Sequence, residues 1–457
     1  MPTTARLIDV GKRADKHTMP QEQINQVLLE EAQKGQRVVR LKGGDPFLFG
    51  RGGDELELLT VNGIPYEIVP GVTSSIAVPA YNGIPVTHRD FCSSVHIITG
   101  HRRAGKEYDI DFKALVNTKG TLVFLMGIAA LSDICFGLLE AGMDPAMPAA
   151  VLQKGTTADQ KRVVATVATL KEEVDRQGIE TPAIIVVGKV CRLADEFGWY
   201  EKLPLAGWKV LVTRPKGRSS RTAEELRRRG AEVLELPSIR TVPLEDQSTL
   251  VHAFEEISSY QWIVFTSGNG VELFFALLRE QGIDLRRLMQ VKFAVIGRKT
   301  AEILLRHGFR SDFVPEQFSG EDLAAEWIPT LKPDEKVALF RAENGSRVLT
   351  EALAAAGISY DDIGLYETWT DLRRQEELNR VISEVDYVTV ASSSAARALA
   401  AMLEPEQRKK LTAKLISIGP STAKAMEKLG LPVYADAVEY TAEGIASVIR
   451  ADVEEML

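Results

Sequence analysis

The stretch Leu41-Lys-Gly-Gly-Asp-Pro-Phe-Leu-Phe-Gly-Arg-Gly-Gly53 places five glycines within thirteen residues. The run before it, Arg37-Val-Val-Arg-Leu41, predicts a short parallel strand, and Asp54–Leu59 predicts a helix. Adjacent glycines after a strand indicate that something approaches the backbone closely. Ligands of parallel α/β sheets bind at the carboxyl ends of strands, so the stretch predicts a ligand site. A tight strand-to-helix turn without a ligand is the alternative interpretation.

Two common phosphate-binding motifs are absent from this stretch. It lacks the Gly-Lys-Ser/Thr ending of a Walker A loop, and no G-x-G-x-x-G dinucleotide fingerprint occurs. The glycine density and Asp45 favour a site of another kind, with Asp45 expected to be buried.

Length and composition limit the class of protein. The 457 residues are 45% hydrophobic and 26% charged, which predicts two to four globular units. No apolar run reaches the roughly 20 residues that span a bilayer, and the amino terminus has no signal-peptide pattern. A net charge of −8 argues against nucleic acid as a partner. Three widely spaced cysteines fit a reducing cytoplasm, so we expect a cytoplasmic protein.

The first half is predicted to be α/β throughout, with a helix over 21–34. A second turn with small and hydroxylated residues, Pro70–Ser75, follows the predicted strand Tyr66–Val69 and marks another ligand position. His88, Cys92 and His96 are spaced by four, but His96 falls in a predicted strand, so no metal is expected. The predicted strands are 5–12, 37–41, 66–69, 95–99, 121–126 and 183–187.

The second half contains an internal repeat, which begins after a boundary near Leu203–Gly207. Lys209–Arg214 matches Lys336–Arg341 at an offset of 127 positions (336 − 209). In both copies a strand meets a Gly-x-x-Thr turn and then a helix, which predicts two similar lobes with a ligand cleft between them. The other matching pairs are Trp262–Ser267 with Tyr387–Ser392, and Ala294–Ala301 with Ile416–Ala423.

Several single residues have both a functional and a structural interpretation. Lys12 is either a site residue or part of a solvated basic loop, and Arg102-Arg103 either binds an anion or forms a wet turn. Thr300 and Thr422 either cap the following helices or help to bind carboxylates there. Tyr366, at the end of the predicted strand Ile363–Leu365, is either functional or a half-buried structural tyrosine.

The first half resembles uroporphyrinogen-III C-methyltransferase over residues 7–200. The matching segments are Val10–Ala14, Pro20–Glu22, Val38–Phe47, Phe49–Gly53, Val69–Gly71, Gly83–Pro85, Thr87–Asp90, Met126-Gly127 and Gly155-Thr156. The resemblance implies methyl transfer from S-adenosyl-L-methionine to uroporphyrinogen III, giving precorrin-2. It also implies Lys12 as a proton donor and a homodimer through this half. The cofactor-binding residues that it implies are Gly43, Gly44, Asp45, Leu48, Thr73, Ser74, Met126 and Gly155.

Residues 207–457 resemble uroporphyrinogen-III synthase, on Val212–Pro215, Phe265–Ser267, both Gly-x-x-Thr turns and Tyr366–Thr368. The resemblance implies closure of hydroxymethylbilane with inversion of the last ring and loss of water. Tyr366 matches the tyrosine that assists loss of the hydroxyl. The substrate-binding residues that it implies are Thr266, Ser267, Thr300, Ser392, Ser393 and Thr422. Basic residues that would face the carboxylate-rich substrates are Arg13, Arg102, Arg214 and Arg218.

The expected organisation is therefore a methyltransferase domain over 1–202 followed by a synthase domain over 207–457. The synthase lobes are expected at 207–240 plus 370–457, and at 241–366. The family's first strand, its Gly-x-Gly-Pro-Gly-Asp loop and its aspartate base have no counterpart here. A misplaced start, a natural truncation and a degenerate domain each account for this difference. Besides the bifunctional enzyme, two alternatives remain open: a synthase with a structural first half, and a non-catalytic tetrapyrrole-binding module.

Overall fold

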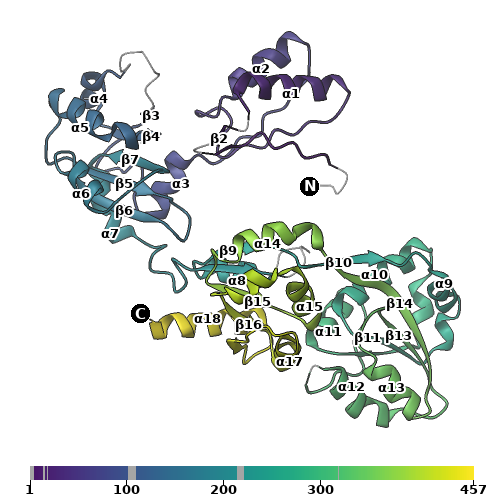
Figure 1. The fold of residues 1–457 in the computed structure, drawn as a ribbon. Coiled ribbons are helices and arrows are strands. Elements are labelled where there is room, and N and C mark those ends of the chain that lie inside the picture. The colour runs from purple at the N-terminus through teal and green to yellow at the C-terminus, as the bar shows by residue number, and fades with distance from the viewer. Residues whose placement is uncertain are drawn as a thin grey trace. The chain divides into compact units, whose positions relative to one another are not determined.

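The computed structural model describes residues 5–13, 16–17, 19–100, 110–213, 221–317 and 319–456. The chain divides into a first unit, Met1–Gly207, and a second unit, Trp208–Leu457 (Figure 1). Within the described residues, no helix is long and apolar enough to cross a bilayer.

The first unit is built on a five-stranded sheet with the order β3-β4-β7-β5-β6. Only β3 and β4 run parallel, and the other neighbours are antiparallel. The predicted strands at 95–99 and 183–187 are confirmed, and the one at 121–126 ends one residue early. The strands are β3 Val95–Thr99, β4 Thr121–Leu125, β5 Pro148–Gln153, β6 Lys161–Thr166 and β7 Ala183–Val187.

Helices cover both faces of this sheet because the side chains of its central strands are apolar on both faces. In β4, Leu122 and Phe124 pack with α5 and α6, whereas Val123 and Leu125 pack with α3 and η2. All four side chains are buried, so β4 lies at the centre of the unit. The helices after residue 73 are α3 Ser74–Tyr81, α4 Phe112–Thr118, η1 Ile128–Ala130, α5 Leu131–Glu140, α6 Leu170–Arg176, η2 Lys189–Leu193 and α7 Ala194–Phe197.

The amino-terminal part consists of a two-residue antiparallel pair and two helices that pack on each other. The helix predicted over 21–34 is confirmed with a one-residue difference at its end. The predicted strands at 5–12, 37–41 and 66–69 are wrong. A strand needs a ladder partner, and in the described part of the chain these runs have none, apart from Lys12 at the end of the first run, which pairs with His17. The elements are β1 Lys12–Arg13, β2 Lys16–His17, α1 Gln21–Gln33 and α2 Gly52–Val61.

The second unit holds two sheets. We name one after Tyr366, a residue of one of its strands, and the other after Ser392, which caps the helix that follows one of its strands. The Tyr366 sheet has the order β12-β11-β13-β14-β10, and the Ser392 sheet has the order β17-β16-β15-β8-β9. The strands of the Tyr366 sheet are β10 Ile239–Pro243, β11 Trp262–Phe265, β12 Lys292–Val295, β13 Lys336–Ala342 and β14 Ser359–Thr370. Those of the Ser392 sheet are β8 Lys209–Val212, β9 Glu232–Glu235, β15 Tyr387–Val390, β16 Lys414–Ser417 and β17 Ala435–Asp436.

The internal repeat is confirmed by the order of four strands in each sheet. The series β12-β11-β13-β14 and the series β16-β15-β8-β9 are both parallel throughout. Most of these strands are followed by a helix, as is usual in parallel sheets, whereas the element after β9 is the strand β10. The helices of this unit are α8 Arg221–Arg228, α9 Ser248–Glu255, α10 Gly268–Glu280, α11 Arg298–Arg306, α12 Gly320–Trp327, α13 Val348–Ala355, α14 Gln375–Val381, α15 Ser393–Met402, α16 Pro405–Lys409, α17 Pro420–Lys428 and α18 Ala442–Met456. The shorter turns are η3 Ile257–Ser259, η4 Leu285–Leu288, η5 Ile328–Thr330 and η6 Leu372–Arg374.

Aromatic rings fill the core beneath the Tyr366 sheet. Phe274 of α10 is fully buried, with its ring centroid 4.7 Å from that of Phe340 and 5.1 Å from that of Phe265. Edge-on contacts of this kind add to the free energy gained by burying the rings. The core therefore fixes α10 against β11 and β13, and with it the start of α10 at the sheet edge.

Candidate functional sites

The glycine turn adopts the conformation that its sequence predicts. Gly44 has a φ of +80°, a left-handed value that favours glycine. The backbone over Gly43 is open, because a Cβ added there would meet nothing within 4 Å. A Cβ on Gly71, by contrast, would lie 2.4 Å from the carbonyl oxygen of Gly44. The two predicted ligand turns, 43–48 and 70–75, therefore pack directly on each other.

Asp45 holds these two turns together, which differs from the role expected of it. Its Oδ1 accepts hydrogen bonds from the backbone N–H of Phe47 (2.8 Å) and of Leu48 (3.1 Å). Its Oδ2 accepts one from the N–H of Gly71 (3.0 Å). The hydrogen bond from Gly71 is the largest of the effects that lower the pKa of Asp45, so the carboxylate is ionised at neutral pH. Asp45 is half-buried, and both of its oxygens are engaged by the protein itself.

A buried carboxylate anchors the chain on the other side of the glycine turn. Glu55 of α2 is 5% exposed, yet it accepts hydrogen bonds from Lys42 Nζ (2.7 Å) and Arg40 Nε (3.2 Å). Gln21 of α1 donates a further bond to Glu55 (3.3 Å). A buried charge requires such partners. Glu55 was not predicted from the sequence, although its place in the first turn of a helix is one that carboxylates favour.

Helix α3 connects the second turn to the loop that carries Gly155. Thr73 caps α3, where its side chain accepts a hydrogen bond from the N–H of Ser75 (3.3 Å) and Ser74 is the first helical residue. A Cβ added to Gly155 would lie 2.3 Å from a methyl carbon of Val78 in α3. Gly155 is flanked by Lys154 and Thr156, both with positive φ. The loop therefore turns tightly against α3, and only glycine fits the contact point.

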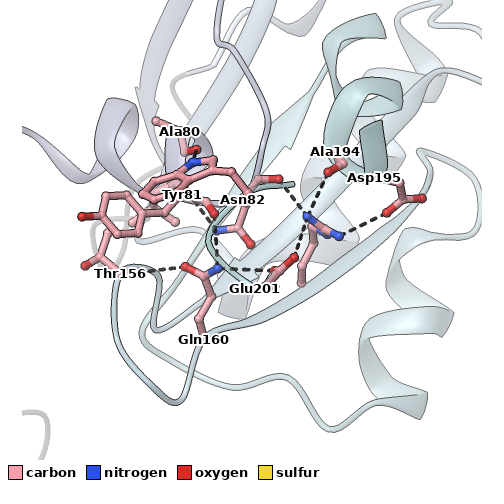
Figure 2. A network of polar contacts seen from close by, with 11 residues as sticks. Ala80, Tyr81, Asn82, Thr156, Gln160, Ala194, Asp195 and Glu201 are labelled. Carbon is pink, nitrogen blue, oxygen red and sulfur yellow. Dashed lines mark hydrogen bonds and ion pairs between the residues drawn. The ribbon is translucent and has the colours of Figure 1, made fainter. Parts of the chain in front are cut away.

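The last carbonyl groups of α3 are bound by three different side chains, as Figure 2 shows. Trp199 Nε1 donates to the oxygen of Ala80 (2.9 Å), and Arg162 donates to the oxygen of Asn82 (2.9 Å). Gln160 Nε2 donates to the oxygen of Tyr81 at 3.5 Å. Carbonyls at a helix end lack partners within the helix, so these bonds fix the end of α3.

Gln160 also connects this helix end to the Gly155 loop. Its Oε1 accepts a hydrogen bond from the N–H of Thr156 at 2.8 Å (Figure 2). One amide side chain thus holds the position next to Gly155 and the carboxyl end of α3. Gln160 was not predicted to belong to the site. It lies five residues after Gly155, and no motif or hydrophobic periodicity at that position indicates a role.

The remaining predicted residues of the first unit are dispersed or not fully described. Met126 follows β4 with a φ of +56° and is 54% exposed. Lys12 lies in β1, and its side chain and that of Arg13 are outside the described residues, as are Arg102, Arg103, Arg214 and Arg218.

In the second unit, Tyr366 and Ser267 meet at the carboxyl edge of the Tyr366 sheet. The Tyr366 hydroxyl and Ser267 Oγ are 3.0 Å apart. Ser267 also caps α10, because its Oγ accepts a hydrogen bond from the N–H of Gly270 (3.0 Å). Tyr366 is 5% exposed, and burial raises the pKa of its hydroxyl. The phenol therefore stays protonated at neutral pH and remains a hydrogen-bond donor.

The Ser392 sheet repeats the capping serine but not the tyrosine. Ser392 caps α15 by accepting a hydrogen bond from the N–H of Ala395 (3.1 Å). Ser393 Oγ lies 3.5 Å from the carbonyl oxygen of Ser421, at the start of α17. Ser393 therefore joins the two helix starts of this sheet edge.

The two Gly-x-x-Thr threonines do not cap their helices, so that interpretation is wrong. The caps are Gly297 and Gly419, and neither has a side chain to form the bond. Thr300 and Thr422 are each the third helical residue and are buried. Thr266 precedes the capping Ser267 and is half-buried. Among the described residues, no group of three His, Cys, Asp or Glu side chains could hold a metal ion.

Two family models match this chain, one in each unit. Residues 2–171 match the tetrapyrrole (corrin/porphyrin) methylases, and residues 220–447 match uroporphyrinogen-III synthase HemD. Together with the two α/β units, these matches define a fusion of a tetrapyrrole methylase with a uroporphyrinogen-III synthase.

Relatives of known name cover both units. The porphyrin biosynthesis protein HemD of Ruminiclostridium josui is 45% identical over 433 residues, which is 94% of this chain and 86% of the relative. The chain belongs to the family of this porphyrin biosynthesis protein.

Two further proteins are similar over shorter stretches. A uroporphyrinogen-III C-methyltransferase of Bacillus subtilis (strain 168) is 39% identical over 305 residues, or 66% of this chain and 62% of that protein. The solved uroporphyrin-III C-methyl transferase of Thermus thermophilus, complexed with S-adenyl homocysteine, is 36% identical. It covers 38% of this chain and 74% of that chain, with a TM-score of 0.34.

Proposed function

We propose that the second unit closes hydroxymethylbilane to uroporphyrinogen III and that the first unit methylates this product to precorrin-2. The observation that carries the proposal is the hydroxyl pair of Tyr366 and Ser267 at the carboxyl edge of a parallel sheet. This edge is where α/β proteins bind ligands. The proposal makes the protein a bifunctional enzyme that supplies the precursor of sirohaem and cobalamin.

The chemistry of ring closure begins with loss of the substrate's hydroxyl group, whose C–O bond breaks as the oxygen gains a proton and leaves as water. Tyr366 is protonated at neutral pH and is proposed to donate a hydrogen bond to that oxygen. Ser267 is held by the N–H of Gly270, so its own hydroxyl hydrogen is free to point at the tyrosine oxygen. A hydrogen bond from Ser267 makes the phenol a stronger donor.

The first unit is proposed to hold S-adenosyl-L-methionine over the glycine turn. The open space at Gly43 supports this assignment, because a Cβ added there would meet nothing within 4 Å. Asp45 acts by fixing the turn against Gly71, and Thr73 places the start of α3 beside it. The bound cofactor supplies the methyl group, and Lys12 is proposed as the proton donor.

A second candidate function is a synthase whose first unit is structural. One observation favours it: the runs before the two paired turns form no ladder with any strand of the described structure. Val39 and Val69 within these runs are 75% and 74% exposed. The glycine turn is therefore held by Asp45 and Glu55 and not by a sheet.

Incubating the purified chain with hydroxymethylbilane and S-adenosyl-L-methionine separates these functions. Uroporphyrinogen III and precorrin-2 together support the bifunctional enzyme, whereas uroporphyrinogen III alone supports the second candidate. Only uroporphyrinogen I, which forms without an enzyme, would refute the synthase. Tyr366→Phe is expected to lower the synthase kcat on the order of 100-fold, the lower range for a general acid. A variant with the parent's kcat would remove Tyr366 from the mechanism.

A further inference from the structure

A β-bulge determines the direction of the Tyr366 side chain. Along β13 and β14, Arg341 pairs with Gly364 and Ala342 pairs with Tyr366, so Leu365 is an extra residue on β14. Neighbouring side chains of a regular strand point to opposite faces. Here Leu365 and Tyr366 both pack into the same apolar core, together with Phe265 and Phe274. The bulge thus turns Tyr366 toward Ser267.

An ion pair between the buried Arg341 and the exposed Asp362 fixes the strands before the bulge. Arg341 is 6% exposed and donates two hydrogen bonds to Asp362, from Nε to Oδ1 (2.7 Å) and from an Nη to Oδ2 (2.6 Å). This paired geometry is the strongest that arginine makes with a carboxylate. The register of the two strands is therefore set just before Leu365.

Strand β13 ends at Ala342, just beyond the bulge, and the loop that follows it continues the hydrogen bonding to β14. The N–H of Glu343 donates to the carbonyl oxygen of Tyr366 (2.8 Å). The side chain of Asn344 then bonds to both backbone groups of Thr368, as the backbone of a neighbouring strand would. Its Nδ2 donates to the Thr368 oxygen (2.9 Å), and its Oδ1 accepts from the Thr368 N–H (3.2 Å).

Stability alone does not account for this use of Asn344. The side chain is exposed, so water would satisfy Thr368 if Asn344 were absent. The loop itself is already joined to β14 by the Glu343 bond. On its other side this part of β14 pairs with β10, where Thr241 lies opposite Thr368. What Asn344 adds is a fixed point on the loop side, two residues beyond Tyr366, that prevents the loop and β14 from shifting relative to each other.

We propose that Asn344 is a positioning residue for Tyr366 in the synthase reaction. It holds the strand beyond the bulge in the register that aims the phenol at Ser267 and at the leaving hydroxyl. The inference rests on the proposed synthase function of Tyr366. According to this inference, the exposed side-chain amide of Asn344 affects the rate of ring closure, although its hydrogen bonds are to Thr368 and not to Tyr366.

The test compares Asn344→Ala with Ser346→Ala, which removes a hydroxyl from the same loop. Asn344→Ala is expected to lower kcat about tenfold, the order expected when two neutral hydrogen bonds are lost. KM and the thermal unfolding temperature should stay close to those of the parent. Ser346→Ala should keep the parent's kcat. Asn344→Asp, which keeps the acceptor for Thr368 but not the donor, should have an intermediate kcat.

A double-mutant cycle shows whether the effect passes through Tyr366. In a Tyr366→Phe background, Asn344→Ala should cause no further loss of kcat. Equal losses in both backgrounds, or an unchanged kcat in Asn344→Ala, would overturn the inference while leaving the proposed function intact. A parent chain that forms no uroporphyrinogen III would overturn the proposed function and this inference together.

Discussion

The contact between the two ligand turns of the first unit allows a matched pair of substitutions. Gly43 and Gly71 each lack the left-handed φ that disfavours other residues, so alanine meets no backbone strain at either position. They differ in what an added Cβ would touch. At Gly43 it meets nothing within 4 Å, and at Gly71 it lies 2.4 Å from the Gly44 oxygen and 2.9 Å from the Gly44 carbonyl carbon.

The size of the effect follows from these contacts. A carbon at 2.4 Å from a backbone oxygen must displace one turn by roughly 1 Å to reach an ordinary contact near 3.5 Å. Such overpacking costs about 1–3 kcal/mol. The displacement also lengthens the hydrogen bond from Gly71 to Asp45. If ligand binding requires the undisturbed turns, the same free energy weakens binding about 5- to 150-fold.

The assay is calorimetric titration of the full chain and both variants with S-adenosyl-L-methionine, the cofactor proposed for the first unit. Gly71→Ala should raise the Kd about 5- to 150-fold over the parent value, as that displacement predicts. Gly43→Ala should keep the parent's unfolding temperature, because its methyl group meets no protein atom within 4 Å, and any rise in its Kd then reports contact with the ligand itself. Equal Kd values for the parent and Gly71→Ala would refute the view that the two turns form one ligand site.

Two further predictions concern stability. Burial alone would raise the pKa of Asp452, but hydrogen bonds from Lys414, Tyr387 and Tyr434 outweigh it and lower the pKa. A carboxylate with a lowered folded pKa stabilises the fold above its unfolded pKa of about 3.9, and this contribution is lost as the pH falls through the folded pKa. Asp452→Asn should therefore lower the unfolding temperature at pH 7 and differ less from the parent at pH 3; a constant difference in calorimetric scans would contradict this. Phe274→Ala should destabilise the second unit by about 3–5 kcal/mol in urea unfolding, because it empties a fully buried aromatic position.

Most predicted strands that have partners within the chain are confirmed, although the paired strands β5 and β6 were not predicted from the sequence. Residues 95–99 and 183–187 form strands as predicted, and so does the repeated series of the second unit. The runs 37–41 and 66–69 also contain the apolar and β-branched residues that strands favour, but they form no strands. Local composition predicts the tendency of a segment to extend, whereas a ladder depends on a neighbour that composition does not specify.

Individual site residues were predictable by type and position but less so by role. Asp45 was expected to face a ligand, and instead it ties its own turn to Gly71. For Thr300, capping of the helix was one of two interpretations, and Gly297 occupies the cap position instead. Which residue forms a given hydrogen bond changes when the start of an element shifts by one residue. Turn motifs do not determine that start so accurately.

The residues that sequence patterns missed share one property: they are polar side chains that bind backbone groups of another segment. Gln160 holds the Gly155 loop to the end of α3, and Asn344 holds the chain beyond Tyr366. In each case the residue named by a motif is positioned by an amide that belongs to no motif. Because glycine turns and bulges have few side-chain contacts of their own, their geometry has to be fixed from outside. The activity of both units should therefore depend on these amides as well as on the motif residues beside them.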